Sequence, residues 1–105
     1  MTEYSMPNVS NNLSGQVALV TGTTSGLGKR FAQVIAASGA KVAVTGRRID
    51  RLEALAKEIN AAGGTAVPIQ LDMQDNESIM NCVDQAEKAL GTVTILVNNA
   101  GIPDA

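Results

Sequence analysis

The apolar residues of this chain form short runs that alternate with helical stripes. The runs are continuously apolar or nearly so, as expected of strands covered on both faces of a sheet. They occupy residues 17–20, 42–44, 65–71 and 95–97. Between the runs, apolar residues recur at spacings of three and four, which is typical of one face of a helix. The three stripes are Leu27, Phe31, Val34 and Ile35; Ile49, Leu52, Leu55, Ala56 and Ile59; and Ile79, Val83, Ala86 and Leu90.

Turn residues mark where these helices begin and end. Ser38-Gly39, Gly63-Gly64 and Gly91 follow the three stripes, and Asp75 is a good N-cap for the third helix. Strands that alternate with helices of this length imply βαβ units, a parallel sheet and right-handed crossovers. Proline cannot donate to a strand ladder, so Pro68 places its strand at a sheet edge.

The pattern therefore predicts an α/β fold with a Rossmann-type, doubly wound parallel sheet. We expect the strand order 3-2-1-4, an order taken from knowledge of this fold, with the sheet incomplete beyond the fourth strand. Residues 15–105 would form the N-terminal part of a nucleotide-binding Rossmann domain, and residues 1–14 a flexible polar leader. In such a fragment, the fourth strand would be an apolar edge that favours self-association.

Composition narrows the function classes. The 105 residues are 45% hydrophobic with a formal net charge of -2, as in one ordinary globular domain. The eight basic residues are scattered, which argues against nucleic acid and membrane surfaces as partners. No apolar run approaches the roughly 20 residues of a membrane span, and the start does not resemble a secretory signal, so we expect a cytoplasmic protein.

The chain has no histidine and one cysteine, Cys82. These counts leave no Ser-His-Asp or Cys-His site and no Cys/His zinc site within the chain, so we predict no metal ligands. Cys82 lies beside the third apolar stripe and has no evident basic partner that would lower its pKa. We therefore expect it to be a small buried residue rather than a reactive thiol.

The turn after the first strand carries the candidate chemistry. It contains glycines in the spacing G-x-x-x-G-x-G, a variant of the dinucleotide fingerprint. Gly22 would permit a tight turn, Gly26 a close approach of a pyrophosphate, and Gly28 close packing of helix and sheet. The N–H groups and dipole of the helix start would hold the anion. Thr23, Thr24 and Ser25 add hydroxyls that could donate to phosphate or cap the helix, and Leu27 completes the candidate binding segment.

Three segments together resemble the short-chain dehydrogenases/reductases. Thr21-Gly22-x-x-x-Gly26-x-Gly28 is similar to the cofactor motif of that family, and the resemblance covers about Ser14 to Ile102. Asp72 follows the third strand, where the resemblance implies an acid that contacts adenine; we count its neighbour Met73 with it. Asp72 could equally serve the turn itself. The segment Asn98-Asn99-Ala100-Gly101 resembles the second family motif. It implies that Asn99 binds the cofactor and ties the sheet together, with Ala100 and Gly101 beside the ribose.

The end of the second strand indicates which nicotinamide cofactor is bound. An NAD site usually places an acid there for the ribose 2′-hydroxyl, whereas this chain reads Thr45-Gly46-Arg47-Arg48. A guanidinium fork suits a 2′-phosphate, so we favour NADP over NAD, with Arg47 as the main contact and Arg48 in support. The alternative is that both arginines are simply solvated. We expect Asp50 to complement the helix dipole rather than bind ribose.

The resemblance implies that the complete protein interconverts a small carbonyl compound and an alcohol by hydride transfer with the cofactor, and that it is a homo-oligomer. In that family, catalysis uses a serine and a Tyr-x-x-x-Lys pair beyond the second motif. The single tyrosine here, Tyr4, lies in the leader and has Asn8 four places later. We therefore predict no catalytic residue in this chain and no activity of the chain alone. A non-catalytic dinucleotide-binding module, or a non-functional truncation, remains the alternative.

Overall fold

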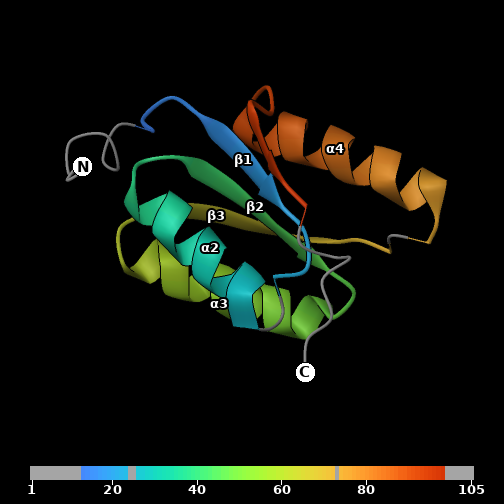
Figure 1. Cartoon of the computed structure of the whole chain (residues 1–105), viewed down its shortest axis with the longest axis horizontal. Helices are drawn as coiled ribbons and strands as arrows, with labels where there is room; N and C mark the ends of the chain where they lie inside the picture. Colours follow the sequence, from blue (N-terminus) through green and yellow to red (C-terminus); the bar gives the residue numbers. More distant parts are fainter. Residues whose placement is uncertain (1–12, 24–25, 73, 99–105) are drawn as a thin grey trace.

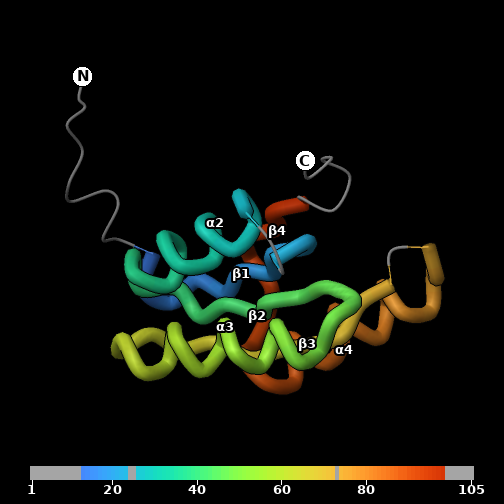
Figure 2. The backbone as a smooth tube through the Cα atoms, turned by 90° about the horizontal axis from the view of Figure 1, so that it is seen from below, coloured from blue at the N-terminus to red at the C-terminus, as the bar shows by residue number. Residues whose placement is uncertain are grey.

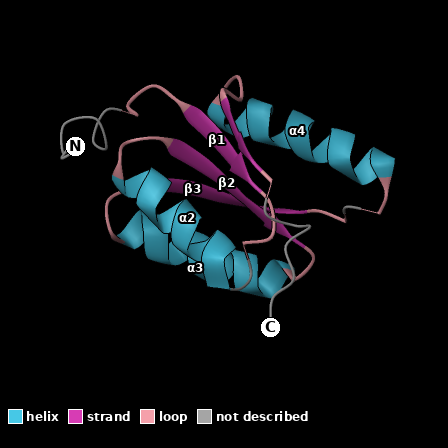
Figure 3. Ribbon diagram, in the orientation of Figure 1, coloured by secondary structure: helices cyan, strands magenta, loops and turns pink. Residues whose placement is uncertain are grey.

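A computed structural model describes residues 13–23, 26–72 and 74–98 of the chain. Strands and helices alternate along it, as the apolar pattern predicts (Figures 1 and 3). The elements are β1 (Val17–Val20), α2 (Gly26–Ala37), β2 (Lys41–Gly46), α3 (Ile49–Ala61), β3 (Thr65–Gln70), α4 (Asn76–Leu90) and β4 (Ile95–Val97).

The four strands form one parallel sheet in the order β3-β2-β1-β4, which confirms the predicted doubly wound topology. Pro68 lies in β3 at one edge of the sheet, also as predicted. Helix α4 lies on the opposite side of the strands from α2 and α3 (Figure 1), and Figure 2 allows the alternation to be followed along the backbone. Among the described residues, no helix is both long and apolar enough to cross a membrane.

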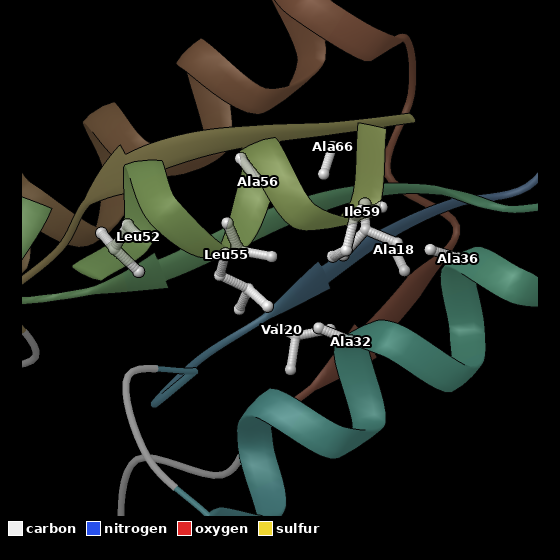
Figure 4. Packing of buried hydrophobic residues seen from close by; sticks show 11 residues of the cluster. Ala18, Val20, Ala32, Ala36, Leu52, Leu55, Ala56, Ile59 and Ala66 are labelled. Carbon is white, nitrogen blue, oxygen red and sulfur yellow. The ribbon is translucent and has the colours of Figure 1, made fainter. Parts of the chain in front are cut away.

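Each face of the sheet has its own hydrophobic cluster. On one face, Val20, Val42 and Val44 pack with the small residues of α2 and with the apolar stripe of α3 (Figure 4). On the other face, Leu19, Ala43 and Ile69 pack against α4. In the central strands β1 and β2, residues are buried on both sides because helices cover both faces, which is the physical reason that these strands read as continuous apolar runs. Leu96 of the edge strand β4 is instead 68% exposed.

Helix α2 buries a different face from the predicted one. Its buried residues are Gly28, Ala32 and Ala36, and Figure 4 shows both alanines directed at the sheet. The predicted stripe is wrong for most of its members: Leu27, Phe31 and Val34 are 48%, 39% and 55% exposed, and only Ile35 is partly buried against the core. Small residues let the helix approach the sheet closely, so the contact face is marked by small side chains, and the large apolar ones lie elsewhere.

The other two helices largely follow the prediction. In α3, the stripe is buried except for Ile49, which is 39% exposed at the first helical residue. In α4, Ala86 and Leu90 are buried, while Ile79 and Val83 are partly buried against the same cluster. The predicted cap is confirmed, since the Asp75 carboxylate accepts a hydrogen bond from the Glu77 N–H at 3.0 Å.

The outer edge of β3 is closed by a side chain from α3. The amide of Asn60 donates to the Ala66 carbonyl at 3.0 Å and accepts from the Ala66 N–H at 2.9 Å. The Leu71 N–H donates to the Gly46 carbonyl at 2.7 Å, so odd-numbered residues of this strand face β2 and even-numbered residues face outward. The next outward residue after Ala66 is Pro68, which has no N–H. This edge therefore offers little to another strand.

Candidate nucleotide-binding site

The carboxyl ends of the four strands lie at one edge of the sheet because all of them are parallel. β1 leads there into the glycine turn, β2 into Arg47 and Arg48, β3 into Asp72, and β4 into Asn98. The motifs that the sequence singles out are thus gathered on one side of the sheet. In open α/β sheets, ligands bind outside the carboxyl ends of the strands, where the strand order reverses. Here that reversal lies between β1 and β4.

The glycine turn has the backbone that its sequence predicts. Gly22 and Gly26 adopt φ values of 66° and 45°, in the left-handed region that favours glycine. Gly28 lies in the first turn of α2 on its buried face, so the helix start sits close against the sheet. Thr24 and Ser25 lie outside the described residues.

The Thr23 hydroxyl is engaged inside the protein. Thr23 is 1% exposed, and its hydroxyl donates to the Thr45 carbonyl at 2.9 Å, beside a 3.1 Å bond from its own N–H to the same oxygen. The hydroxyl of buried Thr45 in turn donates to the Val20 carbonyl at 2.9 Å. These bonds join the glycine turn to the end of β2. The expectation that this hydroxyl is available to a phosphate therefore needs correction: its proton already has a buried partner.

The ends of β1 and β4 are joined in a similar way. The Thr21 N–H donates to the Val97 carbonyl at 2.9 Å, and the Thr21 hydroxyl donates to the side-chain oxygen of Asn98 at 3.1 Å. The first residue of the glycine motif thus contacts the first residue of the second motif across the point where the strand order reverses. Asn99, Ala100 and Gly101 lie outside the described residues.

Arg47 and Arg48 are both exposed where β2 passes into α3. Arg47 lines a cavity of about 260 Å³ together with Gln70, Leu71, Asp72 and Ser78. Arg48 is the N-cap residue of α3 and makes no side-chain cap bond. Among the described residues, neither guanidinium forms an ion pair. Two cations therefore stand unpaired at a helix N-terminus, where the dipole is already positive, an arrangement that favours an anion.

Asp72 has a defined role in its own turn. One of its carboxylate oxygens accepts the Gln74 N–H at 3.0 Å, and its backbone N–H donates to the Ser78 hydroxyl at 3.0 Å. The side chain is exposed at the cavity that Arg47 also lines. The turn role considered from the sequence is therefore present, and the acid faces the same space as Arg47. Met73 lies outside the described residues.

The helix starts differ in charge. α2 has no acidic residue in its first turn, whereas α3 has Asp50 and α4 has Glu77. Asp50 thus lies where it complements the helix dipole, as expected. An acid in the first turn neutralises part of the positive end of a helix, so α2 leaves its N-terminus able to hold an anion.

Neither a metal site nor a reactive thiol is found in the described part of the chain. Residues 13–23, 26–72 and 74–98 contain no group of three or more His, Cys, Asp or Glu side chains that could hold a metal ion. Cys82 is buried at 1% exposure, and burial raises the pKa of its thiol from 9.0 to about 11. The thiol is therefore protonated at neutral pH, which confirms the expectation of a small buried residue.

Sequence reasoning missed two residues that shape the site. Thr45 and Asn98 provide the acceptors that hold Thr23 and Thr21. A threonine inside an otherwise aliphatic strand was a usable signal for Thr45, because a buried hydroxyl needs a partner. The contact of Thr21 with Asn98 could not be read from spacing, since it joins residues 77 positions apart.

Comparison with known proteins agrees with this geometry. A family model described as short chain dehydrogenase matches residues 16–105. A short chain dehydrogenase of Pseudocercospora fijiensis is 44% identical over 86% of this chain. A 2,5-dichloro-2,5-cyclohexadiene-1,4-diol dehydrogenase of Sphingobium indicum is 43% identical over 90% of it. A short-chain type dehydrogenase/reductase from Mycobacterium marinum has a similar structure, with a TM-score of 0.85 and 40% identity over 92% of this chain. The chain spans only 29%, 38% and 39% of the lengths of these three proteins, respectively.

Proposed function

This chain belongs to the short-chain dehydrogenase family of oxidoreductases, and we propose that it forms the NADP-binding portion of an enzyme that interconverts a carbonyl and an alcohol. The cofactor, when bound, supplies or accepts the hydride. The proposal for NADP rests on one observation above the others: Arg47 and Arg48 stand exposed and unpaired, among the described residues, at the end of β2.

The described residues fit a dinucleotide in its two charged parts. The turn from Gly22 to Gly28 joins a buried strand to a helix start that lacks a first-turn acid, which suits a pyrophosphate. Arg47 follows the end of the adjacent strand, β2, and a planar guanidinium can bind a 2′-phosphate through two parallel hydrogen bonds. We expect Asp72, which lines the same cavity as Arg47, to accept a hydrogen bond from a base.

Chemistry in the complete protein would need residues beyond this chain. The resemblance implies a serine, a tyrosine and a lysine, and the single tyrosine of this chain precedes the glycine turn. We therefore propose that these 105 residues bind and orient the cofactor and do not transfer hydride by themselves.

The experiment is a fluorescence titration of the chain with NADPH and NADH. Replacing Arg47 by alanine should weaken NADPH binding by about 10- to 100-fold, since a hydrogen bond to a charged group contributes about 1.5–3 kcal/mol. NADH, which has no 2′-phosphate, should bind the variant and the parent about equally. Arg30→Ala is the matched control, because Arg30 is exposed on α2 outside this cavity.

Three results would contradict the proposal. An equal loss of NADPH and NADH affinity would mean that Arg47 supports the fold or the shared part of the cofactor. A preference of the parent for NADH would refute the choice of NADP. Binding of neither dinucleotide would favour a non-functional truncation.

A further inference from the structure

Arg47 lies on the α4 side of the end of β2. Side chains alternate between the two faces of a strand. Ala43 packs in the cluster on the α4 face, and Val44 packs in the cluster on the α2 and α3 face. Arg47 is an even number of residues after Ala43, and it lines its cavity together with Ser78 of α4. A group bound over the end of β2 therefore meets Arg47 on one face and leaves the other face to a different residue.

A second cavity lies on that other face, beside the glycine turn. It has a volume of about 150 Å³, ample for a phosphate group, and Thr23 of the glycine turn forms part of its wall. The Thr23 hydroxyl and N–H both donate to the Thr45 carbonyl, so this wall is joined directly to the end of β2. The remaining lining residues come from α2 and α3; they are Lys29, Arg51, Ala54, Leu55 and Glu58.

The charged groups of this cavity leave one guanidinium without a partner. One carboxylate oxygen of Glu58 lies 3.8 Å from the ammonium of Lys29, and the other accepts a hydrogen bond from the Gln33 amide at 3.3 Å. The charges of Lys29 and Glu58 thus compensate one another. Arg51 is exposed, and within residues 13–23, 26–72 and 74–98 it forms no ion pair. The cavity therefore carries a net positive charge that belongs to Arg51.

Helix α3 begins further toward the carboxyl ends of the strands than α2 does. Lys29 comes three residues after the first residue of α2, whereas its partner Glu58 comes nine residues after the first residue of α3. At about 1.5 Å per residue, α3 starts about 9 Å beyond the start of α2, as can be followed in Figure 1. Arg51, Leu55 and Glu58 recur at spacings of four and three, so Arg51 lies on the flank of α3 that faces α2. It therefore lies beside the glycine turn, beyond the start of α2.

We propose that Arg51 is a further specificity-determining residue for NADP, which contacts the 2′-phosphate from the α2 and α3 side of β2 while Arg47 contacts it from the α4 side. This inference rests on the proposed function and adds a residue from within α3 to the pair at the strand end. A phosphate between the two guanidinium groups would pair both of them. It would also offset the repulsion between Arg51 and the positive end of α3, in whose first turn Arg51 lies.

The test is isothermal titration calorimetry of the polypeptide as its source cells produce it. The ligands are adenosine 2′,5′-bisphosphate and adenosine 5′-monophosphate, which differ only in the 2′-phosphate. Arg51→Gln removes the charge and keeps most of the side chain, and Arg51→Lys keeps the charge without the guanidinium fork. Lys57→Gln is the matched control, because Lys57 is an exposed cation of α3 that lines neither cavity. Arg47→Ala, in the same assay, tests the proposed function by itself.

Arg51→Gln should weaken binding of the bisphosphate about tenfold, the lower end of the range for a hydrogen bond to a charged group, and should change binding of the monophosphate by less than about twofold. Arg51→Lys should lose less affinity than Arg51→Gln, and Lys57→Gln should lose none.

Three results would overturn the role of Arg51. If Arg51→Gln keeps its affinity for the bisphosphate while Arg47→Ala loses it, only the inference about Arg51 fails, and the proposed NADP site stands. Equal losses for the two ligands in Arg51→Gln would mean that Arg51 acts on the fold or on the shared part of the ligand. A parent protein that binds both ligands equally well would refute the choice of NADP, and the inference with it.

Discussion

Replacing Thr23 by valine separates a structural role of its hydroxyl from a role in phosphate binding. Valine has nearly the same shape, with a methyl group in place of the hydroxyl, so the change removes the 2.9 Å bond to the Thr45 carbonyl and little else. The carbonyl keeps its bond from the Thr23 N–H at 3.1 Å and is not left without a donor. The cost should therefore be that of one neutral hydrogen bond, about 1 kcal/mol, rather than the larger penalty of a buried unpaired group.

Urea unfolding of the chain, followed by circular dichroism, measures this cost. With a slope of about 1–3 kcal/mol per molar urea, a loss of 1 kcal/mol lowers the midpoint by about 0.3–1 M. Dinucleotide affinity of the folded variant should change by no more than about twofold. Thr65→Val is the matched control, because Thr65 is exposed at the start of β3 and its midpoint should hardly move.

The opposite pattern would refute this interpretation. If the hydroxyl donated to phosphate, its loss would remove a charge-assisted bond of about 1.5–3 kcal/mol and weaken dinucleotide binding by about 10- to 100-fold. The urea midpoint would then stay where it is in the parent chain. The two roles thus differ in which measurement moves.

Three further predictions concern stability. Asn60→Ala removes both hydrogen bonds to the β3 edge and should lower the free energy of unfolding, measured in urea, by about 2 kcal/mol. Asn81→Ala, on an exposed part of α4, is the control for helix propensity. An equal effect of the two substitutions would contradict the role of Asn60 at the edge. Ala32→Leu should cost about 1–3 kcal/mol by overpacking α2 against the sheet, whereas Val34→Leu on its exposed flank should be nearly neutral; the reverse order would restore the large apolar stripe as the buried face. Burial raises the pKa of the Cys82 thiol from 9.0 to about 11, so on raising the pH the unfolded chain loses the thiol proton before the folded chain does. The free energy of unfolding should therefore fall between pH 9 and about 11. This fall should be absent in Cys82→Ala, and an identical pH profile for the variant and the parent would contradict the burial of the thiol.

Strands β1 and β2 could be predicted from the sequence because they are buried on both faces, whereas the strand order was taken from knowledge of the fold. That burial produces continuous apolar runs such as the one at Val17–Val20, which half-exposed strands do not have. Pro68, which has no N–H to donate, indicated that β3 lies at an edge of the sheet. The glycine spacing identified the turn between β1 and α2. The location of the candidate site could be predicted because parallel strands bring their carboxyl ends to one edge of the sheet, so residues far apart in sequence meet there.

The buried face of α2 could not be predicted by the same reasoning, because in this helix the buried residues are small and most of the large apolar residues are exposed. Apolar periodicity gives most weight to leucine, valine and phenylalanine, whereas the site requires the helix to lie close against the sheet, with Gly28, Ala32 and Ala36 at the contact. The same closeness brings the N-terminus of α2 to the end of β1, where the glycine turn can present its N–H groups to an anion. Close contact between the helix and the sheet thus accounts for the small residues on the inner face, whereas Leu27, Phe31 and Val34 lie on the exposed flank. The need for close contact between α2 and the sheet is therefore the physical reason that the predicted stripe and the buried face differ.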